Sequence, residues 1–236
     1  MRNELYKLKK GNERITYRGA NASRVDNLTD AVFGIAITLL IFNLTNPNSF
    51  ADLLTFTKTL PAFLISIFFI ILIWREHLDF SKMYTLEDSG LSILNTVFIA
   101  LVIFYVYPLR FLTLFLTNNF FNTDIAVSIR GDQVPYLMVY YGFVAFALYF
   151  VLYLFYVRAY RIKDKLDLSD FELKHTAFQK TRLMIMFAVP LLSIALTLIV
   201  NNYSFIWASV VGGLSYLIYT PLMFWWSSRY DRMVKE

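Results

Sequence analysis

The sequence predicts an all-α, polytopic membrane protein with six transmembrane helices in a single domain over residues 1–236. Composition and apolar run length indicate this fold class. Of the 236 residues, 58% are hydrophobic and only 17% are charged, whereas soluble domains carry about 25% charged residues. Apolar runs of about 20 residues, the length that crosses the hydrocarbon core, recur between charged loops. The 23 Phe and 16 Tyr residues also fit the aromatic belts of membrane proteins.

Three apolar segments in the first half of the chain are predicted to cross the membrane. They cover about residues 28–46, 54–74 and 91–116. The first follows a charged and polar cluster that begins at Arg24, and the second runs into the sequence Trp-Arg-Glu-His at its end.

Three further spans are predicted at about residues 134–157, 183–200 and 203–226. Ser169 and Glu172 precede the fifth span with the spacing of a capping box, in which each side chain satisfies a backbone donor near the other. A short helix is therefore expected to start there and feed the fifth span. Only Asn201 and Asn202 separate the last two spans, which predicts a tight antiparallel pair.

The basic residues lie mostly on one predicted side of the membrane. All of the 22 Lys and Arg residues except Lys58, Arg110 and Arg130 fall in the segments expected on that side. By the positive-inside rule both termini are expected in the cytoplasm, in a multi-pass protein of the cell (inner or plasma) membrane. The net charge of +5 is explained by this topology, so no nucleic-acid partner is expected.

The residue types exclude several kinds of chemistry. The chain has no Cys, which excludes disulfides, thiol catalysis and Cys-ligated metals. Its second His, His175, lies alone in a basic loop, so no catalytic group, metal site or cofactor is expected, and the protein is not expected to be an enzyme.

The first predicted span opens with the pattern Arg24-x-x-x-Leu28-Thr29-Asp30. Charged groups at the mouth of a membrane span are costly unless they are paired. The pattern resembles the first-helix signature Arg-x-x-x-Phe-Ser-Asp of the transmembrane protein 175 family of potassium channels. Leu28 stands in place of Phe, and Thr29 in place of Ser.

The resemblance implies a bacterial or archaeal type of channel with one six-span unit in each chain. In that family the first helix lines the pore, and one unit per chain implies that several chains assemble it. We therefore expect a homotetramer surrounded by membrane lipids, with K⁺ as the permeant ion. The expected function is a potassium-selective, leak-type channel.

The first span carries one almost purely apolar stripe when it is drawn as a helix with about 100° per residue. This stripe contains Ile35, Thr38, Leu39, Phe42 and Asn46. From the stripe alone, packing or lipid contact is the commoner explanation. The resemblance assigns the constriction to Ile35, Leu39 and Phe42, with Thr38 as the one hydroxyl beside them and Asn46 at the outer mouth. No Thr-Val-Gly-Tyr-Gly filter is present.

Polar residues of the first three spans meet at the predicted cytoplasmic side, and His and Asn at matching places recur in the resembled family. We predict one network that fixes the pore helix. Its members would be Arg24, Leu28, Thr29 and Asp30 from the signature, together with Trp74, His77 and Asn95. The alternative is that Thr29 or Asp30 is an ordinary helix N-cap and His77 an interfacial residue.

Two other functions stay open at this stage. A secondary transporter would use Asp30 to couple flux to protons or cations. An intramembrane enzyme or lipid-binding protein would use Asp30, His77 and Arg24 together at the level of the headgroups.

Overall fold

The computed structural model describes residues 15–19, 23–42, 48–85, 88–121 and 129–235, and these residues form helices and connecting loops without a β-strand. The elements are α2 (Arg24–Phe42), α3 (Phe50–Thr57), α4 (Leu60–Tyr84), α5 (Ser89–Phe121), the 3₁₀ turn η1 (Gly131–Gln133), α6 (Val134–Arg161), α7 (Asp170–Asn201), α8 (Phe205–Ser215), the 3₁₀ turn η2 (Tyr216–Ile218) and α9 (Tyr219–Lys235). The prediction of an all-α polytopic membrane protein is confirmed.

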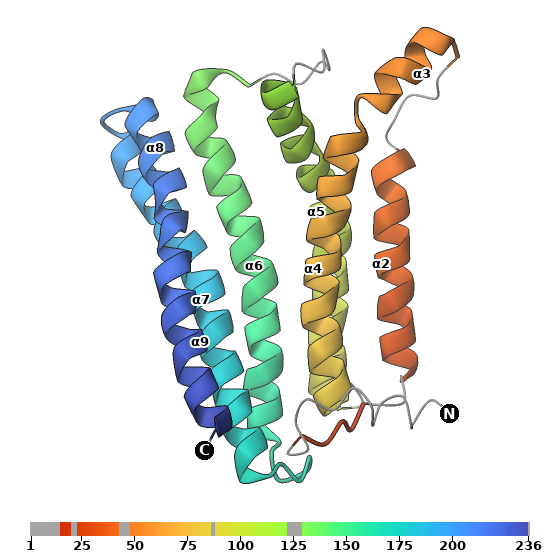
Figure 1. Ribbon diagram of the computed structural model, residues 1–236, viewed down its shortest axis with the longest axis vertical. Helices are drawn as coiled ribbons and strands as arrows, with labels where there is room; N and C mark the ends of the chain where they lie inside the picture. The colour runs from red at the N-terminus through yellow and green to blue at the C-terminus, as the bar shows by residue number, and fades with distance from the viewer. Residues whose placement is uncertain (1–14, 20–22, 43–47, 86–87, 122–128, 236) are drawn as a thin grey trace.

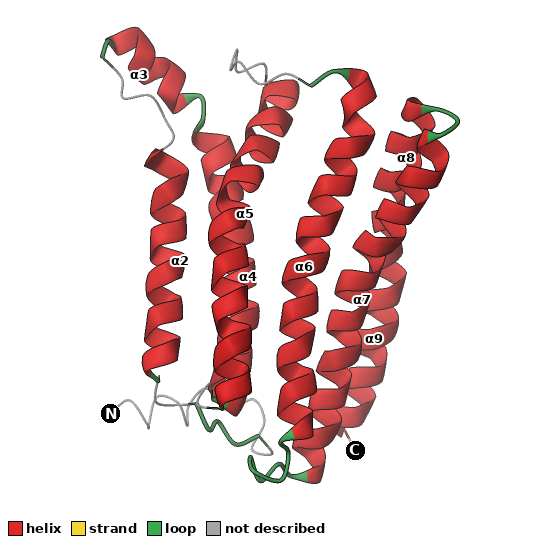
Figure 2. Ribbon diagram, turned by 180° about the vertical axis from the view of Figure 1, so that it is seen from behind, coloured by secondary structure: helices red, strands yellow, loops and turns green. Residues whose placement is uncertain are grey.

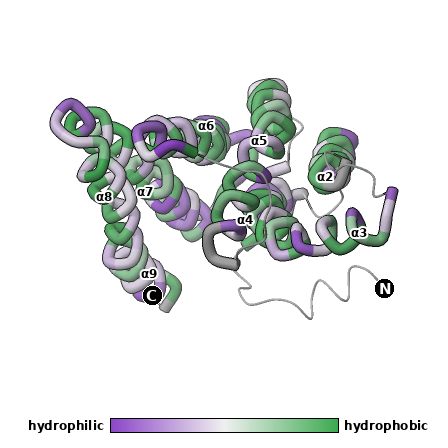
Figure 3. Tube along the Cα trace, turned by 90° about the horizontal axis from the view of Figure 1, so that it is seen from above, coloured by the Kyte–Doolittle hydropathy of each residue, from purple (hydrophilic) through white to green (hydrophobic). Residues whose placement is uncertain are grey.

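The long helices stand side by side, with α6 between an α2–α4–α5 group and an α7–α8–α9 group (Figure 1). The reverse view in Figure 2 shows the same order, with α2 at one edge and the short helix α3 projecting beyond the bundle. Among the described helices, α2 packs mainly against α4 and α5. Seen from above in Figure 3, it stands at the periphery of the bundle. One side of α2 is therefore left without a neighbouring helix in the described part of the chain.

Among the described residues, five helices are long and apolar enough to cross a membrane, in the ranges 60–84, 89–118, 131–161, 170–201 and 205–234. Helix α2, with 19 residues, supplies the sixth segment. It begins at Arg24 rather than near residue 28, because Ser23 and Asp26 cap it. The Ser23 N–H donates to the Asp26 carboxylate at 2.8 Å, and the Asp26 N–H donates to Ser23 Oγ at 3.2 Å. The suggestion that Thr29 or Asp30 is the N-cap is therefore wrong.

Two predicted spans are interrupted, and proline supplies a physical reason in both. The second does not run unbroken from residue 54, because α3 ends at Thr57 and α4 starts afresh with Pro61 in its first turn. The sixth is divided by η2 into α8 and α9. Pro221 has no N–H for the carbonyl of Leu217, which removes one α-helical hydrogen bond at this point.

The fifth span is one continuous helix, α7, that includes the predicted cytoplasmic start. Ser169 and Glu172 form the predicted capping box, with the Ser169 N–H 2.9 Å from a Glu172 carboxylate oxygen. Pro190 lies inside α7 and deprives the Met186 carbonyl of its helical donor. The Tyr219 hydroxyl donates to that carbonyl at 2.6 Å, so α9 satisfies the group that the proline leaves free.

Aromatic rings fill the core between α4, α5 and α6. Phe80 lies 5.0 Å from Phe155 and 4.9 Å from Tyr156, measured between ring centroids. The ring of His77 stacks on Phe98 at 5.1 Å with an interplanar angle of 9°. Such ring contacts add to the free energy of burial and fix the rotation of each helix about its axis.

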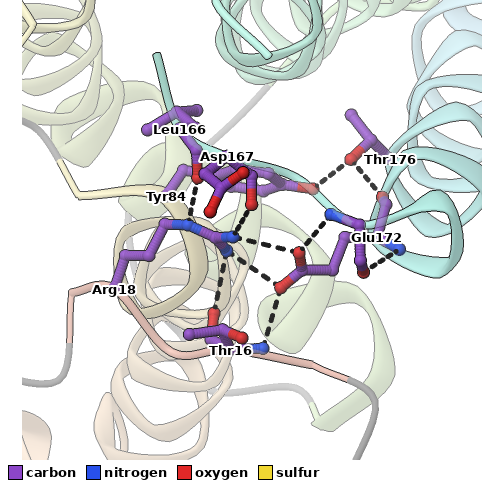
Figure 4. Close-up of polar contacts among 8 residues, drawn as sticks. Thr16, Arg18, Tyr84, Leu166, Asp167, Glu172 and Thr176 are labelled. Carbon is purple, nitrogen blue, oxygen red and sulfur yellow. Dashed lines mark hydrogen bonds and ion pairs between the residues drawn. The ribbon is translucent and has the colours of Figure 1, made fainter. Parts of the chain in front are cut away.

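The short segment 15–19, which precedes α2, is tied to the far half of the bundle (Figure 4). Arg18 donates through both terminal nitrogens to the carboxylate of Glu172, at 2.9 and 3.0 Å, and the Thr16 N–H donates to the same carboxylate at 2.8 Å. Glu172 is only 1% exposed. A buried carboxylate with this many donors is well compensated, so the contact holds the entry to α2 against the start of α7.

The entry segment also makes a close backbone approach to α4. The Gly19 N–H donates to the Lys82 carbonyl at 2.9 Å. A Cβ added at Gly19 would lie 1.9 Å from the Ser81 carbonyl oxygen, so no larger residue fits there without moving the backbone.

Candidate functional site

Helix α2 divides into a buried face and an exposed face. Val32, Phe33, Ala36 and Leu40 are buried and form its contact with the rest of the chain. The uncovered face carries Leu28, Ala31, Gly34, Ile35 and Thr38. Leu28 is 56% exposed and Ile35 54% exposed, although both are large apolar side chains. This face needs either lipid or another protein surface in the membrane.

The predicted constriction residues do not all lie equally on this uncovered face. Ile35 and Thr38 are exposed there, whereas Leu39 is half-buried and packs partly against the hydrophobic core. Phe42 is the last residue of α2, but its side chain lies outside the described part of the structure, and Asn46 lies outside the described residues altogether. The stripe drawn from helical periodicity is thus wider than the face that the single chain leaves open.

Two details of the uncovered face bear on what could approach it. The Thr38 hydroxyl donates to the Gly34 carbonyl at 2.9 Å, which leaves the lone pairs of its oxygen available on the exposed side. A Cβ added at Gly34 would meet nothing within 4 Å. Small residues such as Gly34 and Ala31 allow helices to approach closely in lipid.

A chain of buried polar side chains anchors the start of α2 to α5 and α4. The amide N–H of Asn95 donates to Thr29 Oγ1 at 2.8 Å, and Asn95 Oδ1 lies 2.8 Å from His77 Nε2. Thr29 Oγ1 in turn donates to the Val25 carbonyl at 2.9 Å. Since Oδ1 of an amide can only accept, Nε2 of His77 carries the proton in this bond. All three side chains are at most 3% exposed, so the anchor is shielded from competing water.

The remaining members of the predicted network do not join this chain. Asp30 is exposed and accepts a hydrogen bond from the indole N–H of Trp74 at 2.8 Å, so Trp74 bonds the carboxylate rather than merely packing beside it. Arg24 is exposed and makes no ion pair with a described residue. The expectation of one network is therefore wrong. Residues Thr29, His77 and Asn95 form one cluster, Asp30 and Trp74 form a separate pair, and Arg24 and Leu28 belong to neither.

Sequence reasoning missed two polar groups that hold α2. Asp26, only 6% exposed, is the buried carboxylate at the start of the helix, in the role that the sequence suggested for Asp30. The spacing Ser23-x-x-Asp26 was the available signal for it. At the other end of α2, Arg110 of α5 donates to the Leu40 carbonyl at 2.6 Å. A cation near the C-terminal carbonyls of a helix is favourable, because those carbonyls carry the negative end of the helix dipole.

The three groups proposed for an enzymatic or lipid-binding site do not come together. His77 is buried against Asn95 and Phe98, Asp30 is exposed beside Trp74, and Arg24 is exposed and makes no ion pair or hydrogen bond with either of them. Within the described residues no group of three or more His, Asp or Glu side chains could hold a metal ion.

Comparison with known proteins places this geometry in a family. Residues 24–105, which include α2 and the anchor residues, match the family model described as endosomal/lysosomal potassium channel TMEM175. A protein of Marivirga tractuosa named "Potassium channel" is 35% identical over 220 residues, covering 90% of this chain and 89% of that protein. The crystal structure of a T38A variant of the potassium channel MtTMEM175, in complex with a nanobody–MBP fusion, superposes with a TM-score of 0.84 at 33% identity. That match covers 94% of this chain and 98% of the solved one. This chain therefore belongs to the TMEM175 family of potassium channels.

Proposed function

We propose that the chain forms a potassium-selective, leak-type channel in which α2 of each subunit lines the ion path. The observation that carries the proposal is the uncovered face of α2. A membrane helix that buries one face in its own subunit and exposes Ile35, Thr38 and the open Gly34 on the other is suited to stand at a shared axis. The similar proteins named as potassium channels support K⁺ as the permeant ion.

The constriction would be apolar, with Ile35 and Leu39 at its centre and Phe42 one turn further along α2. An apolar neck offers few groups to replace the water that an ion sheds. K⁺ is more weakly hydrated than Na⁺, so it loses less on entering such a neck. The Thr38 hydroxyl supplies a side-chain oxygen at this level, and weak binding is what conduction requires, because a tightly held ion would not leave. Asn46 would line the outer mouth.

The assembly we propose is a homotetramer in a lipid bilayer, with four copies of α2 around the axis. One copy of α2 cannot enclose a pore, and closed cyclic symmetry is the usual solution. Both termini would be cytoplasmic in the cell membrane. The start of α2 and the end of α9 lie at the same end of the bundle, as this orientation requires (Figure 1). No cofactor is needed for passive conduction.

Recording from purified protein in planar bilayers tests the function. With K⁺ on one side and Na⁺ on the other, we expect unitary current steps and a reversal potential displaced toward K⁺. A secondary transporter that couples through the exposed Asp30 would instead give saturable, pH-coupled flux without current steps. Native mass spectrometry of the 27.6 kDa chain tests the assembly. Monomers or dimers alone would exclude the tetramer.

A further inference from the structure

We propose that the early part of α7 (residues 177–181) and the later part of α9 (residues 225–229) together form a binding site for the phosphate headgroup of an anionic phospholipid. A cavity of about 190 Å³ lies between these two helices. It is lined by Ala177, Phe178, Thr181, Trp225, Trp226 and Arg229. The site is remote from α2, and its ligand is a lipid rather than a permeating ion.

Trp226 links the two helices that form the walls of this cavity. Its indole N–H donates to the Phe178 carbonyl at 2.8 Å, which joins α9 to α7 across the site. Its ring stacks on Tyr230 at 5.3 Å with an interplanar angle of 13°. A preformed wall lowers the entropy that binding must offset.

The cationic group at the cavity is Arg229. Its guanidinium carbon lies over the Trp225 ring, 4.7 Å from the ring centre. Arg18, Arg158 and Arg182 are each paired with a carboxylate, whereas Arg229 makes no ion pair or hydrogen bond with a described residue. No carboxylate lines the cavity. A planar guanidinium with free donors is a group that recognises phosphate.

The surroundings of the cavity favour a lipid over a soluble anion. Phe224 is 75% exposed and Trp225 46% exposed on the outer side of α9, and Met184 is exposed one turn further into the apolar part of α7. Trp side chains gather at the membrane–water interface, with the charged residues just beyond it. A phosphate bound to Arg229 would therefore leave its acyl chains lying along these apolar side chains.

The charge pattern beyond the cavity matches an anionic headgroup. Lys174 is exposed on α7 and Arg232 is exposed on α9, and each lies about one turn further from the apolar part of its helix than the cavity residues. Neither is paired with a carboxylate in the described structure. Asp170 and Asp231 lie on the same parts of the two helices, so Lys174, Arg229 and Arg232 leave a smaller but still positive net charge. Such a site at the interface favours phosphatidylglycerol over the zwitterionic phosphatidylcholine.

Native mass spectrometry of the assembled protein, with phosphatidylglycerol and phosphatidylcholine competing, tests the site. We expect the wild type to retain phosphatidylglycerol preferentially and Arg229→Gln to weaken that preference about fivefold, the effect of one basic residue at an anionic surface. Arg161→Gln is the matched control, because Arg161 is exposed at the same end of the bundle and makes no ion pair among the described residues. This control should keep the wild-type preference.

Other outcomes would overturn the proposal. Equal losses in Arg229→Gln and Arg161→Gln would mean diffuse attraction to the whole basic surface, and no loss in either would mean that Arg229 binds no headgroup. A second arm adds inorganic phosphate and glycerol phosphate. If these displace phosphatidylglycerol at equal concentration, the site is one for a soluble anion. None of these readouts requires ion flux, so the site and the channel function fail independently.

Discussion

Asn95 donates its side-chain N–H to Thr29 Oγ1 at 2.8 Å, joining two helices across 66 positions of sequence. The same amide accepts from His77 Nε2, so one side chain of α5 holds α2 and α4 together at a buried point. Because α2 has few other neighbours, this hydrogen-bonded chain fixes its height and rotation in the subunit.

Replacing Asn95 by Leu should destabilise the protein by about 1–3 kcal/mol, because the buried Nε2–H of His77 would lose its acceptor and Thr29 Oγ1 would keep only its bond to the Val25 carbonyl. The measurement is the thermal unfolding of the assembled protein in detergent. Thr96→Ala is the control, since Thr96 is exposed on the same helix and its hydroxyl bonds only the Ser92 carbonyl. Equal melting temperatures for Asn95→Leu and wild type would show that the anchor contributes nothing.

Thr38→Ala should fold and conduct but should favour K⁺ over Na⁺ less strongly than the wild type. The change removes an oxygen from the exposed face of α2 and widens the neck slightly, while Ala preserves the helix. A partly hydrated ion then passes with more of its water, so hydration discriminates less. The measurement is the reversal potential under bi-ionic K⁺/Na⁺ conditions.

Ile35→Ala provides the matched comparison for Thr38→Ala, because both residues lie on the exposed face of α2. Shortening Ile35 lowers the apolar barrier, so unitary conductance should rise. If the reversal potential of Thr38→Ala equals that of the wild type, the hydroxyl does not set selectivity and the assignment of the pore face must be rotated.

Asp30→Asn should preserve assembly but lower K⁺ conductance at low ionic strength. The amide oxygen of Asn can still accept from the Trp74 indole, so the pair survives, whereas one negative charge per subunit is lost beside the pore face. The deficit should shrink toward 1 M salt, where the Debye length is about 3 Å. Asp164→Asn, at an exposed residue in the loop between α6 and α7, should leave conductance unchanged. If the conductance of Asp30→Asn is lowered equally at low and high salt concentration, the role of Asp30 is not electrostatic.

Arg18→Gln should destabilise the protein by about 3–5 kcal/mol, because it leaves the buried Glu172 carboxylate without its cation. The double change Arg18→Gln with Glu172→Gln should recover part of this loss, since the charge is then gone. Arg24→Gln, at an exposed arginine that makes no ion pair with a described residue, should stay within about 0.5 kcal/mol of the wild type. The measurement is the thermal unfolding of the wild type, Arg18→Gln, the double variant and Arg24→Gln under the same conditions. Equal effects of Arg18→Gln and Arg24→Gln would remove the special role of the Glu172 contact.

The Asp88–Arg158 ion pair should give the protein a small loss of folding stability at acid pH. Hydrogen bonds from the Arg158 guanidinium at 2.8 and 3.0 Å hold the pKa of Asp88 below its ordinary value of 3.8. A carboxylate with a lowered pKa stabilises the fold fully above the unfolded pKa, and that contribution is lost as the pH falls below about 4. The ion pair is partly exposed, so the loss should be at most about 1 kcal/mol. In Asp88→Asn this step should be absent from unfolding free energies measured between pH 6 and about pH 3.

Several features of this protein could be read from neighbouring residues alone. The six apolar segments, the Ser169–Glu172 cap of α7 and the signature at the start of α2 depend on composition and on spacings of a few residues. Hydropathy and capping are local properties, so the fold class followed from them, while the family was indicated by the resemblance of the signature that begins at Arg24. Pro61 and Pro221 are equally local signals of a helix break, but the predicted boundaries of the second and sixth spans did not take them into account.

The side-chain partners were decided by the tertiary structure. Asp30 pairs with Trp74 and not Arg24, and Arg110 reaches the end of α2 across 70 positions of sequence. Helical periodicity places a residue on a broad face, but a hydrogen bond requires atoms within about 3 Å. That distance depends on the rotation, tilt and height of each helix, which the packing of rings such as His77 on Phe98 fixes across the bundle. The sequence by itself thus determined which helices form and which family they belong to, while the packing of those helices alone decided which side chains hold α2 and which face of it stays open.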